Sequence, residues 1–311
     1  ALLGELVCDP VTYHGRFVPE YFESEKTNLL EAIRSLINDK RDWADSRLLR
    51  ALCDGEAYAV PRLGDEETVD KLQALKVYTQ YRDLISTAPL EIIYSGSADL
   101  ERVKQALAAA FATLPREEVR VISTAAPHVC RESVQYVEDV LDVTQGKLGM
   151  GFSCGSDDMP ALLMGNTLFG GSSNSKLFLN VREKLSLCYY ASSLYHRQKG
   201  LITVSSGIEF QNYQRAYDEI MAQLEAVQKG ELEDWELEGA RSTLLNSYAT
   251  VGDSQGKLEN FYLGQAATGQ HETPADLARA IQDMTAERIC RAMSTVKLDT
   301  VYFLKGKEAE A

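Results

Sequence analysis

The hydrophobic periodicity of the chain changes once, across a segment at 116–131 that is rich in charged residues, Ser and Thr. Before this segment, apolar residues recur every three or four positions, as at Leu29 and Ile33, which predicts amphipathic helices. After it, apolar residues alternate with small or polar ones at 148–153 and 202–208, which predicts half-buried strands. A chain that combines these two patterns is expected to adopt an α+β fold.

The same segment gives the expected domain division. The chain has 311 residues, close to two domains of roughly 150 residues each. We expect the C-terminal portion of a first domain at 1–115, a linker at 116–131 and a second domain at 132–311. Each half combines helices with a segment of strand composition, Leu90–Tyr94 in the first and Val301–Leu304 in the second. This predicts two related sheet-plus-helix units, of which the first has fewer strands.

Charge and cysteine content exclude several classes of function. The chain carries 46 acidic and 32 basic residues, a net charge of −14, and such a surface repels phosphate backbones. No stretch approaches the roughly 18 apolar residues of a membrane helix. The six cysteines form no Cys-x-x-Cys pair, and the first residues have no signal-peptide pattern. We therefore expect a cytoplasmic protein with reduced thiols that binds neither nucleic acid nor membrane.

The histidines do not form a zinc motif. A helical zinc site needs two imidazoles one turn apart, as in H-x-x-x-H, so that both point at one ion. The chain contains only His14, His128, His196 and His271, which are far apart in the sequence. We interpret each as a surface or packed residue and expect no metal ligand among them.

One segment combines side chains that could contact a peptide. A helix is expected to include Val181–Leu185, with Arg182 near its end, and Tyr189 follows at the expected start of a strand. A guanidinium and a phenol both donate hydrogen bonds, and together they could grip a peptide carbonyl while the strand edge pairs with an extended peptide. Taken alone, the pattern favours an ordinary helix-terminal cation and strand aromatic.

The segment Asn174–Ser193 resembles the Arg…Tyr segment in the second domain of peptidase family M16, the insulinase and mitochondrial processing peptidase family of zinc peptidases. That segment reads approximately S-x-L-F-x-x-x-R-E-K-x-G-L-x-Y, and this chain departs from it at Ser186. The resemblance extends to Phe22–Ile33, Gly64–Asp65 and Leu90–Pro115. It implies two units of the M16 and LuxS-like metallohydrolase fold, with the first lacking its N-terminal strands.

The resemblance also implies that the chain has no zinc site or catalytic residue of its own. In active members, an H-x-x-E-H helix and a downstream Glu hold the metal. Ala32 occupies the position of that Glu, and a methyl group cannot ligate zinc. Glu31 is adjacent, but one residue along a helix turns a side chain by about 100°. The H-x-x-E-H segment, expected upstream of Ala1, does not occur in this sequence.

The implied function is that of a non-catalytic subunit in a two-chain zinc peptidase. Arg182 and Tyr189 would bind the substrate carbonyl beside the scissile bond, and Gly170 and Gly171 would border the peptide channel, although a plain connector is the simpler interpretation of this Gly–Ser loop. A zinc-bearing M16 homologue would be the partner and an extended peptide the substrate. The resemblance points to bacterial proteins associated with elongation factor P modification.

Two alternatives stay open at this point. An active M16 peptidase would need H-x-x-E-H in a preceding segment and a register in which Glu31 replaces Ala32. A peptide-binding scaffold would use the same clamshell without proteolysis. In either case, a first unit without its opening strands would expose the apolar faces of its helices, including Phe22 and Phe111, so we also expect self-association.

Overall fold

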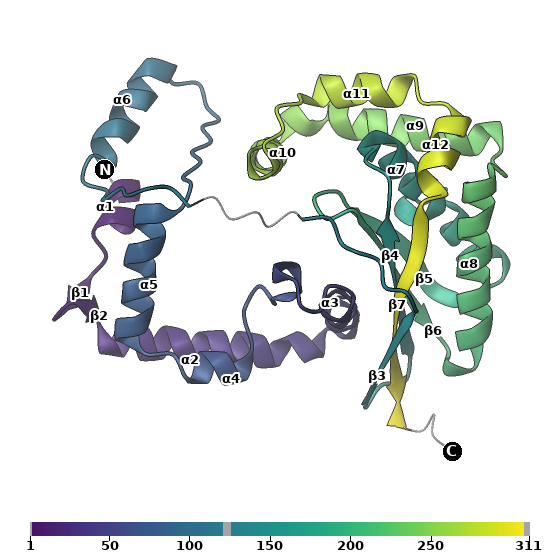
Figure 1. Ribbon diagram of the computed structural model, residues 1–311, viewed down its shortest axis with the longest axis horizontal. Helices are drawn as coiled ribbons and strands as arrows, with labels where there is room; N and C mark the ends of the chain where they lie inside the picture. Colours follow the sequence, from purple (N-terminus) through teal and green to yellow (C-terminus); the bar gives the residue numbers. More distant parts are fainter. Residues whose placement is uncertain (1, 121–125, 308–311) are drawn as a thin grey trace. The chain divides into compact units, whose positions relative to one another are not determined.

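The computed structural model describes residues 2–120 and 126–307, which form two compact units (Figure 1). Unit 1 comprises 1–36 and 61–123, and unit 2 comprises 37–60 and 124–311, each within the described ranges. Residues 37–60 therefore pack with the second half of the chain. Part of the expected linker, 121–125, lies outside the described residues. The division into two homologous domains stays a prediction.

Unit 1 consists mainly of helices. Pro19 lies in the first turn of the long helix α2. A backbone N–H there has no acceptor within the helix, so its absence in proline costs no helical hydrogen bond. Ion pairs from Arg34 to Glu66 and from Lys26 to Asp70 connect this helix to the short helix α4. The elements are α1 Leu2–Cys8, β1 Thr12–Tyr13, β2 Arg16–Phe17, α2 Pro19–Ser35, α4 Glu66–Asp70, α5 Ala74–Thr87 and α6 Leu100–Ala110.

The predicted strand at Leu90–Tyr94 is wrong, because the structure leaves this segment irregular. Its apolar side chains are exposed, with Leu90 at 48% and Ile93 at 37%. A strand needs a neighbouring strand to bond its backbone, and none pairs with this segment in the described chain. Val69, at 4% exposure, is the one buried apolar side chain in the described part of unit 1.

A five-stranded sheet organises unit 2, in the order β3-β7-β4-β6-β5. The strands are β3 Gln135–Leu141, β4 Gly146–Cys154, β5 Cys188–His196, β6 Leu201–Ile208 and β7 Val296–Gly306. β3 runs parallel to β7, and the other neighbours are antiparallel. The strands predicted at 148–153 and 202–208 are confirmed. β5 pairs only with β6 among the described strands, so its outer edge is free of a strand partner.

Helices cover both faces of this sheet (Figure 1). On one face, the apolar residues of β4 that include Leu148 and Phe152 join a large core with α8 and α12. On the other face, Gly149 and Gly151 let α3 lie directly on the strand, because a Cβ at Gly151 would come within 2.7 Å of Leu52. The helices are α3 Lys40–Leu52, α7 Met159–Asn166, α8 Tyr213–Lys229, α9 Asp234–Ala249, α10 Gln255–Thr268, α11 Pro274–Gln282 and α12 Ala286–Met293.

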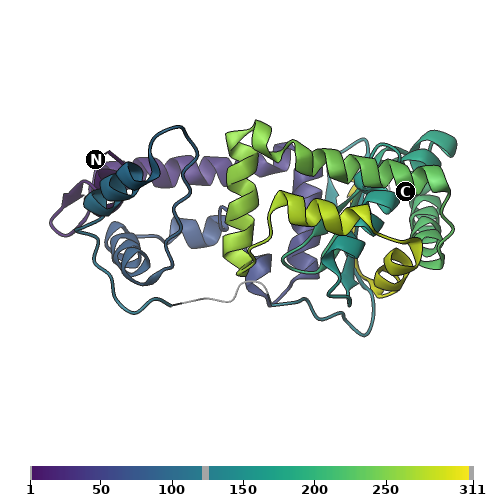
Figure 2. The same ribbon diagram turned by 90° about the horizontal axis from the view of Figure 1, so that it is seen from above.

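Two of these helices, α9 and α11, lie side by side (Figures 1 and 2). Thr273 caps α11 and Pro274 follows in its first turn. Arg241 of α9 donates to the carbonyl oxygens of Ile281 and Gln282, at 2.7 and 2.6 Å, which satisfies the end of α11. Short 3-10 turns lie at η1 Leu36–Asn38, η2 Ala57–Ala59, η5 Phe210–Asn212 and η6 Val251–Asp253. Among the described helices, none has the length and apolar character to cross a membrane.

Candidate functional site

Two π-helical segments precede the edge strand β5. The first, η3 Thr167–Gly171, extends α7, and the second, η4 Leu177–Lys184, carries Arg182. The amide of Leu185 donates to the carbonyl of Asn180 at 3.1 Å, which is the wide turn of a π-helix. Such turns are rare and frequently found at functional sites, because they rotate side chains out of the usual helical positions.

Arg182 and Tyr189, predicted to act together, lie in direct contact. Nε of Arg182 donates to the backbone carbonyl of Tyr189 at 3.0 Å. Its Nη1 lies 3.0 Å from a carboxylate oxygen of Glu183, and its guanidinium lies 4.7 Å from the ring centre of Phe178. Nη2 has no protein partner among the described residues. The side chain is therefore held in place while one donor group stays available.

The phenol of Tyr189 already has an acceptor. Its hydroxyl donates to Glu209, at the end of β6, while the side chain remains 58% exposed. The bond to Glu209 raises the pKa of Tyr189 above its ordinary value, because ionisation of the phenol would place two negative charges together. The hydroxyl therefore stays protonated and can donate to a substrate only after it leaves Glu209.

Ser186, where the family segment usually has glycine, adopts a left-handed backbone with a φ of 49°. This conformation costs an ordinary residue about 1–2 kcal/mol but is open to glycine. The turn that separates Arg182 from Tyr189 is thus kept here despite the substitution.

A cavity of about 460 Å³ runs beside the outer edge of β5. All four predicted residues, Gly170, Gly171, Arg182 and Tyr189, line it. Gly170 also has a packing reason to be glycine, because a Cβ there would lie 2.8 Å from the backbone nitrogen of Ser193. The other lining residues are Arg41, Ser172, Ser173, Phe178, Tyr190, Ala191, Ser192 and Ser193.

Arg41, which comes from α3, also lines the cavity and was not predicted from the sequence. Its Nη2 donates to the hydroxyl of Ser192 at 3.3 Å, and its guanidinium stacks on Tyr190 at 4.3 Å from the ring centre. Arg41 precedes these partners by about 150 residues, and no local pattern connects them. Only the packing of α3 on the sheet brings a second guanidinium to the cavity.

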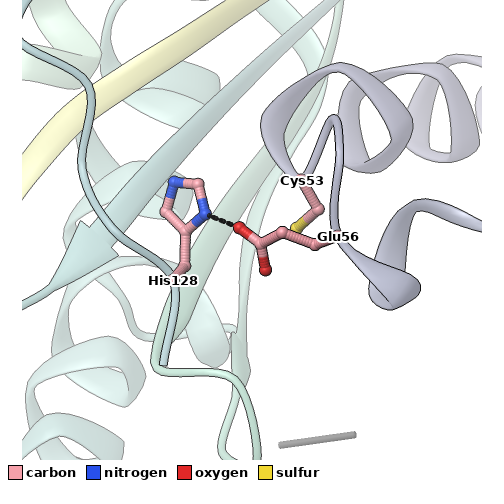
Figure 3. Close-up of side chains that lie close together, drawn as sticks. All are labelled: Cys53, Glu56 and His128. Carbon is pink, nitrogen blue, oxygen red and sulfur yellow. Dashed lines mark hydrogen bonds and ion pairs between the residues drawn. The ribbon is translucent and has the colours of Figure 1, made fainter. Parts of the chain in front are cut away.

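The positions expected for zinc ligands do not fit a metal. Ala32 lies on α2 as a half-buried methyl group, and Glu31 beside it is exposed. In the described part of the chain, one cluster has three potential ligands within 4.8 Å of one another, namely Cys53, Glu56 and His128 (Figure 3). It belongs to unit 2 and includes none of the predicted positions.

The charges of this cluster are already balanced. Glu56 forms an ion pair with the buried ammonium of Lys199 and accepts a 2.6 Å hydrogen bond from Nδ1 of His128. The other ring nitrogen of His128 lies 3.2 Å from Asp299, which also binds Arg131 at 2.6 Å. A metal ion would have to bind beside the Lys199 ammonium and the Arg131 guanidinium, which would repel it.

The protonation states agree with a structural network. Burial and the nearby charge of Glu56 raise the pKa of the Cys53 thiol to about 11, so the thiol is protonated within this network. Burial alone would raise the pKa of Glu56, but hydrogen bonds from Lys199 and His128 lower it. The cluster does not fit a zinc site, and it fastens the end of α3 to the sheet.

This combination of a helix-covered mixed sheet, a π-helical arginine segment and a tyrosine at the edge strand defines a peptidase-like α+β fold. Residues 71–244 match the family described as "Peptidase M16 inactive domain". The chain is 35% identical over 314 residues to the "Probable inactive metalloprotease YmfF" of Bacillus subtilis, covering 99% of this chain and 72% of that protein. The chain therefore belongs to peptidase family M16, and the predicted resemblance is confirmed.

Other comparisons agree with this assignment. The "Uncharacterized zinc protease YmxG" of Bacillus subtilis is 23% identical over 290 residues, covering 89% of this chain and 68% of that protein. A crystal structure of a conserved protein from Enterococcus faecalis matches with a TM-score of 0.86 and 26% identity, covering 98% of this chain and 73% of the other. A peptidase M16 inactive domain from Pseudomonas fluorescens shares the fold at 17% identity, with a TM-score of 0.79 and coverage of 98% and 74%. The predicted α+β fold of the M16 type is confirmed.

Proposed function

We propose that this protein is a non-catalytic subunit of a two-chain M16 zinc peptidase, in which it binds the substrate and a homologous partner supplies the zinc. The observation that carries this proposal is the cavity beside the unpaired edge of β5, where Arg182 and Tyr189 meet. The similarity to YmfF, a probable inactive metalloprotease, supports the absence of independent activity. The substitution at Ala32 supports it on chemical grounds.

The substrate would bind as an extended peptide. The outer edge of β5 presents backbone groups that no described strand satisfies, so a peptide can add to the sheet by main-chain hydrogen bonds. Nη2 of Arg182 would then donate to the carbonyl beside the scissile bond, and Tyr189 would join it after leaving Glu209. Gly170 and Gly171 would border the channel.

Reconstitution with a zinc-bearing M16 homologue from the same organism tests this role. Arg182→Ala should lower kcat/KM by about 10²–10³ if the guanidinium stabilises the charge that develops on the carbonyl oxygen. Tyr189→Phe should act in the same direction. Arg215→Ala, an exposed position on α8, is the matched control. Unchanged kcat/KM in the Arg182 and Tyr189 variants would overturn the proposed role.

The isolated protein provides a second test. Purified chain that cleaved peptides unaided, and stopped when a chelator was added, would favour an active peptidase instead. Peptide binding without cleavage, both alone and with the zinc-bearing homologue, would favour a scaffold. The apolar side chains exposed on unit 1, such as Leu84 and Ile92, also predict self-association of the isolated chain, and a clean monomer in light scattering would contradict that expectation.

A further inference from the structure

We infer that the cavity beside β5 selects peptides that carry a carboxylate, which Arg41 and Arg182 bind together. This inference rests on the proposed function, because it names the class of peptide that the same site accepts. The decisive feature is the juxtaposition of two guanidinium groups in one cavity whose lining contains no carboxylate. That composition is unexpected in a chain with a net charge of −14.

The first part of the argument concerns the charge of Arg41. No ion pair within 4 Å joins Arg41 to a carboxylate in the described chain, although Arg41 lies near enough to Asp39 and Asp45 for its charge to favour the ionised form of both carboxyl groups. Neither of these aspartates lines the cavity. The guanidinium of Arg41 therefore reaches the cavity with no carboxylate in direct contact, which leaves its free donors to a ligand.

The second part concerns how firmly Arg41 is held. Stacking on Tyr190 and the hydrogen bond to Ser192 fix the plane of the guanidinium. Tyr190 and Ser192 are alternate residues of β5, so both point to the same face of the strand. A guanidinium fixed in this way loses little freedom when it forms the paired hydrogen bonds that a carboxylate accepts.

The third part concerns the kind of anion. The cavity follows a strand edge that suits an extended peptide, and serine hydroxyls from Ser172, Ser173 and Ser192 add short-range donors. A polyanion such as nucleic acid would be repelled by the remaining acidic surface. A single carboxylate on a peptide can accept from Arg41 and from the remaining Nη2 donor of Arg182, whose Nε and Nη1 already contact Tyr189 and Glu183, without that repulsion. Its source is either an Asp or Glu side chain or the C-terminal carboxylate.

Binding of fluorescein-labelled peptides, followed by anisotropy, distinguishes these sources. Four versions of one extended peptide are compared: with Glu or Gln at a central position, each with a free or an amidated C-terminus. We expect the peptide that retains the recognised carboxylate to bind at least about tenfold more tightly than the matched peptide in which that group is an amide, either Gln or the amidated C-terminus. Hydrogen bonds to charged groups are the stronger class. The preference should shrink when the salt concentration is raised.

Variants separate this inference from the proposed function. Arg41→Gln should weaken binding of the carboxylate peptide at least about tenfold more than binding of the neutral peptide, whereas Arg182→Ala should weaken binding of every version. Arg215→Gln is the matched control, and circular dichroism checks that each variant is folded. Equal affinity of wild type for carboxylate and amide peptides, or equal weakening of both by Arg41→Gln, would overturn the inference and leave the proposed function in place. If no version bound to wild type, both proposals would fail.

Discussion

The hydroxyl of Tyr189 donates a hydrogen bond to Glu209, so the phenol assigned to the substrate is engaged within the protein itself. Arg182, by contrast, contacts Tyr189 through the backbone carbonyl and keeps Nη2 available. The two donors are therefore not equally ready to bind. Substrate binding at Tyr189 has to compete with Glu209, and this competition can be measured.

Removing the competing carboxylate should strengthen peptide binding. In Glu209→Ala the phenol is free to donate, and one neutral hydrogen bond of about 0.5–1.5 kcal/mol corresponds to a Kd about two- to tenfold lower. Labelling with ¹³C-tyrosine and NMR titration should also show the pKa of Tyr189 falling toward its ordinary value, because the bond to Glu209 raises it. Glu259→Ala, exposed on α10, is the control. The gain should vanish in Tyr189→Phe/Glu209→Ala, and a gain that persisted there would show that the phenol is not its source.

Restoring glycine at the left-handed turn should stabilise unit 2. Ser186 has a φ of 49°, and glycine removes the strain of about 1–2 kcal/mol at a smaller cost in unfolded-state entropy. We expect Ser186→Gly to raise the free energy of unfolding by up to about 1 kcal/mol in urea denaturation. Ser172→Gly, where φ is −143°, should instead lower it. Equal effects at both positions would mean that the turn is not strained.

The sequence predicted those features that short-range patterns determine. The alternation in β4 and β6 depends on neighbouring residues, and it occurs in the structure. The order of Arg182 at a helix end and Tyr189 at a strand start is equally local, and it is also found. The overall M16-type fold was predicted from the family resemblance and not from these local patterns.

Features that depend on distant segments were not predicted. Leu90–Tyr94 has strand composition, but composition does not supply the neighbouring strand that its backbone would need. The approach of Arg41 to Tyr190 requires α3 to lie on the sheet, which the sequence pattern could not show. The sequence shows the glycines at 149 and 151 as small residues in a strand. Only the structure shows that they leave room for the side chains of α3.

Because α3 lies in close contact with β4, a glycine-to-alanine substitution between them should destabilise the protein more than one at an open position. A methyl group at Gly151 would lie 2.7 Å from one methyl carbon of Leu52 and 3.1 Å from the other. Such overpacking typically costs about 1–3 kcal/mol, so Gly151→Ala should lower the free energy of unfolding by that amount. Gly252→Ala is the matched control, because nothing lies within 4 Å of its added carbon. Similar stability of the two variants would show that α3 can shift away from the strand.

The network around His128 predicts that unit 2 loses stability in acid. Burial alone would raise the pKa of Asp299, but bonds from the Arg131 backbone, Thr300 and His128 lower it, and the pKa of Glu56 is lowered similarly. A carboxylate whose pKa is lower in the folded state stabilises the fold fully above its unfolded pKa, and this contribution is lost as pH falls through the folded pKa. The loss of stability should therefore begin below about pH 4.5 for Glu56 and below about pH 3.8 for Asp299, which are the ordinary pKa values of these side chains.

Urea denaturation between pH 7 and pH 3 measures this loss, with Trp43 of α3 as the fluorescent probe in a Trp235→Phe background. At pH 7, Asp299→Asn should lower the free energy of unfolding by about 3–5 kcal/mol, because it leaves the part-buried guanidinium of Arg131 without its buried partner. Its stability should also vary less with pH than that of wild type over the acidic range. Asp253→Asn, at an exposed position, should change neither quantity. An Asp299→Asn protein as stable as wild type at pH 7 would show that this network does not hold α3 on the sheet.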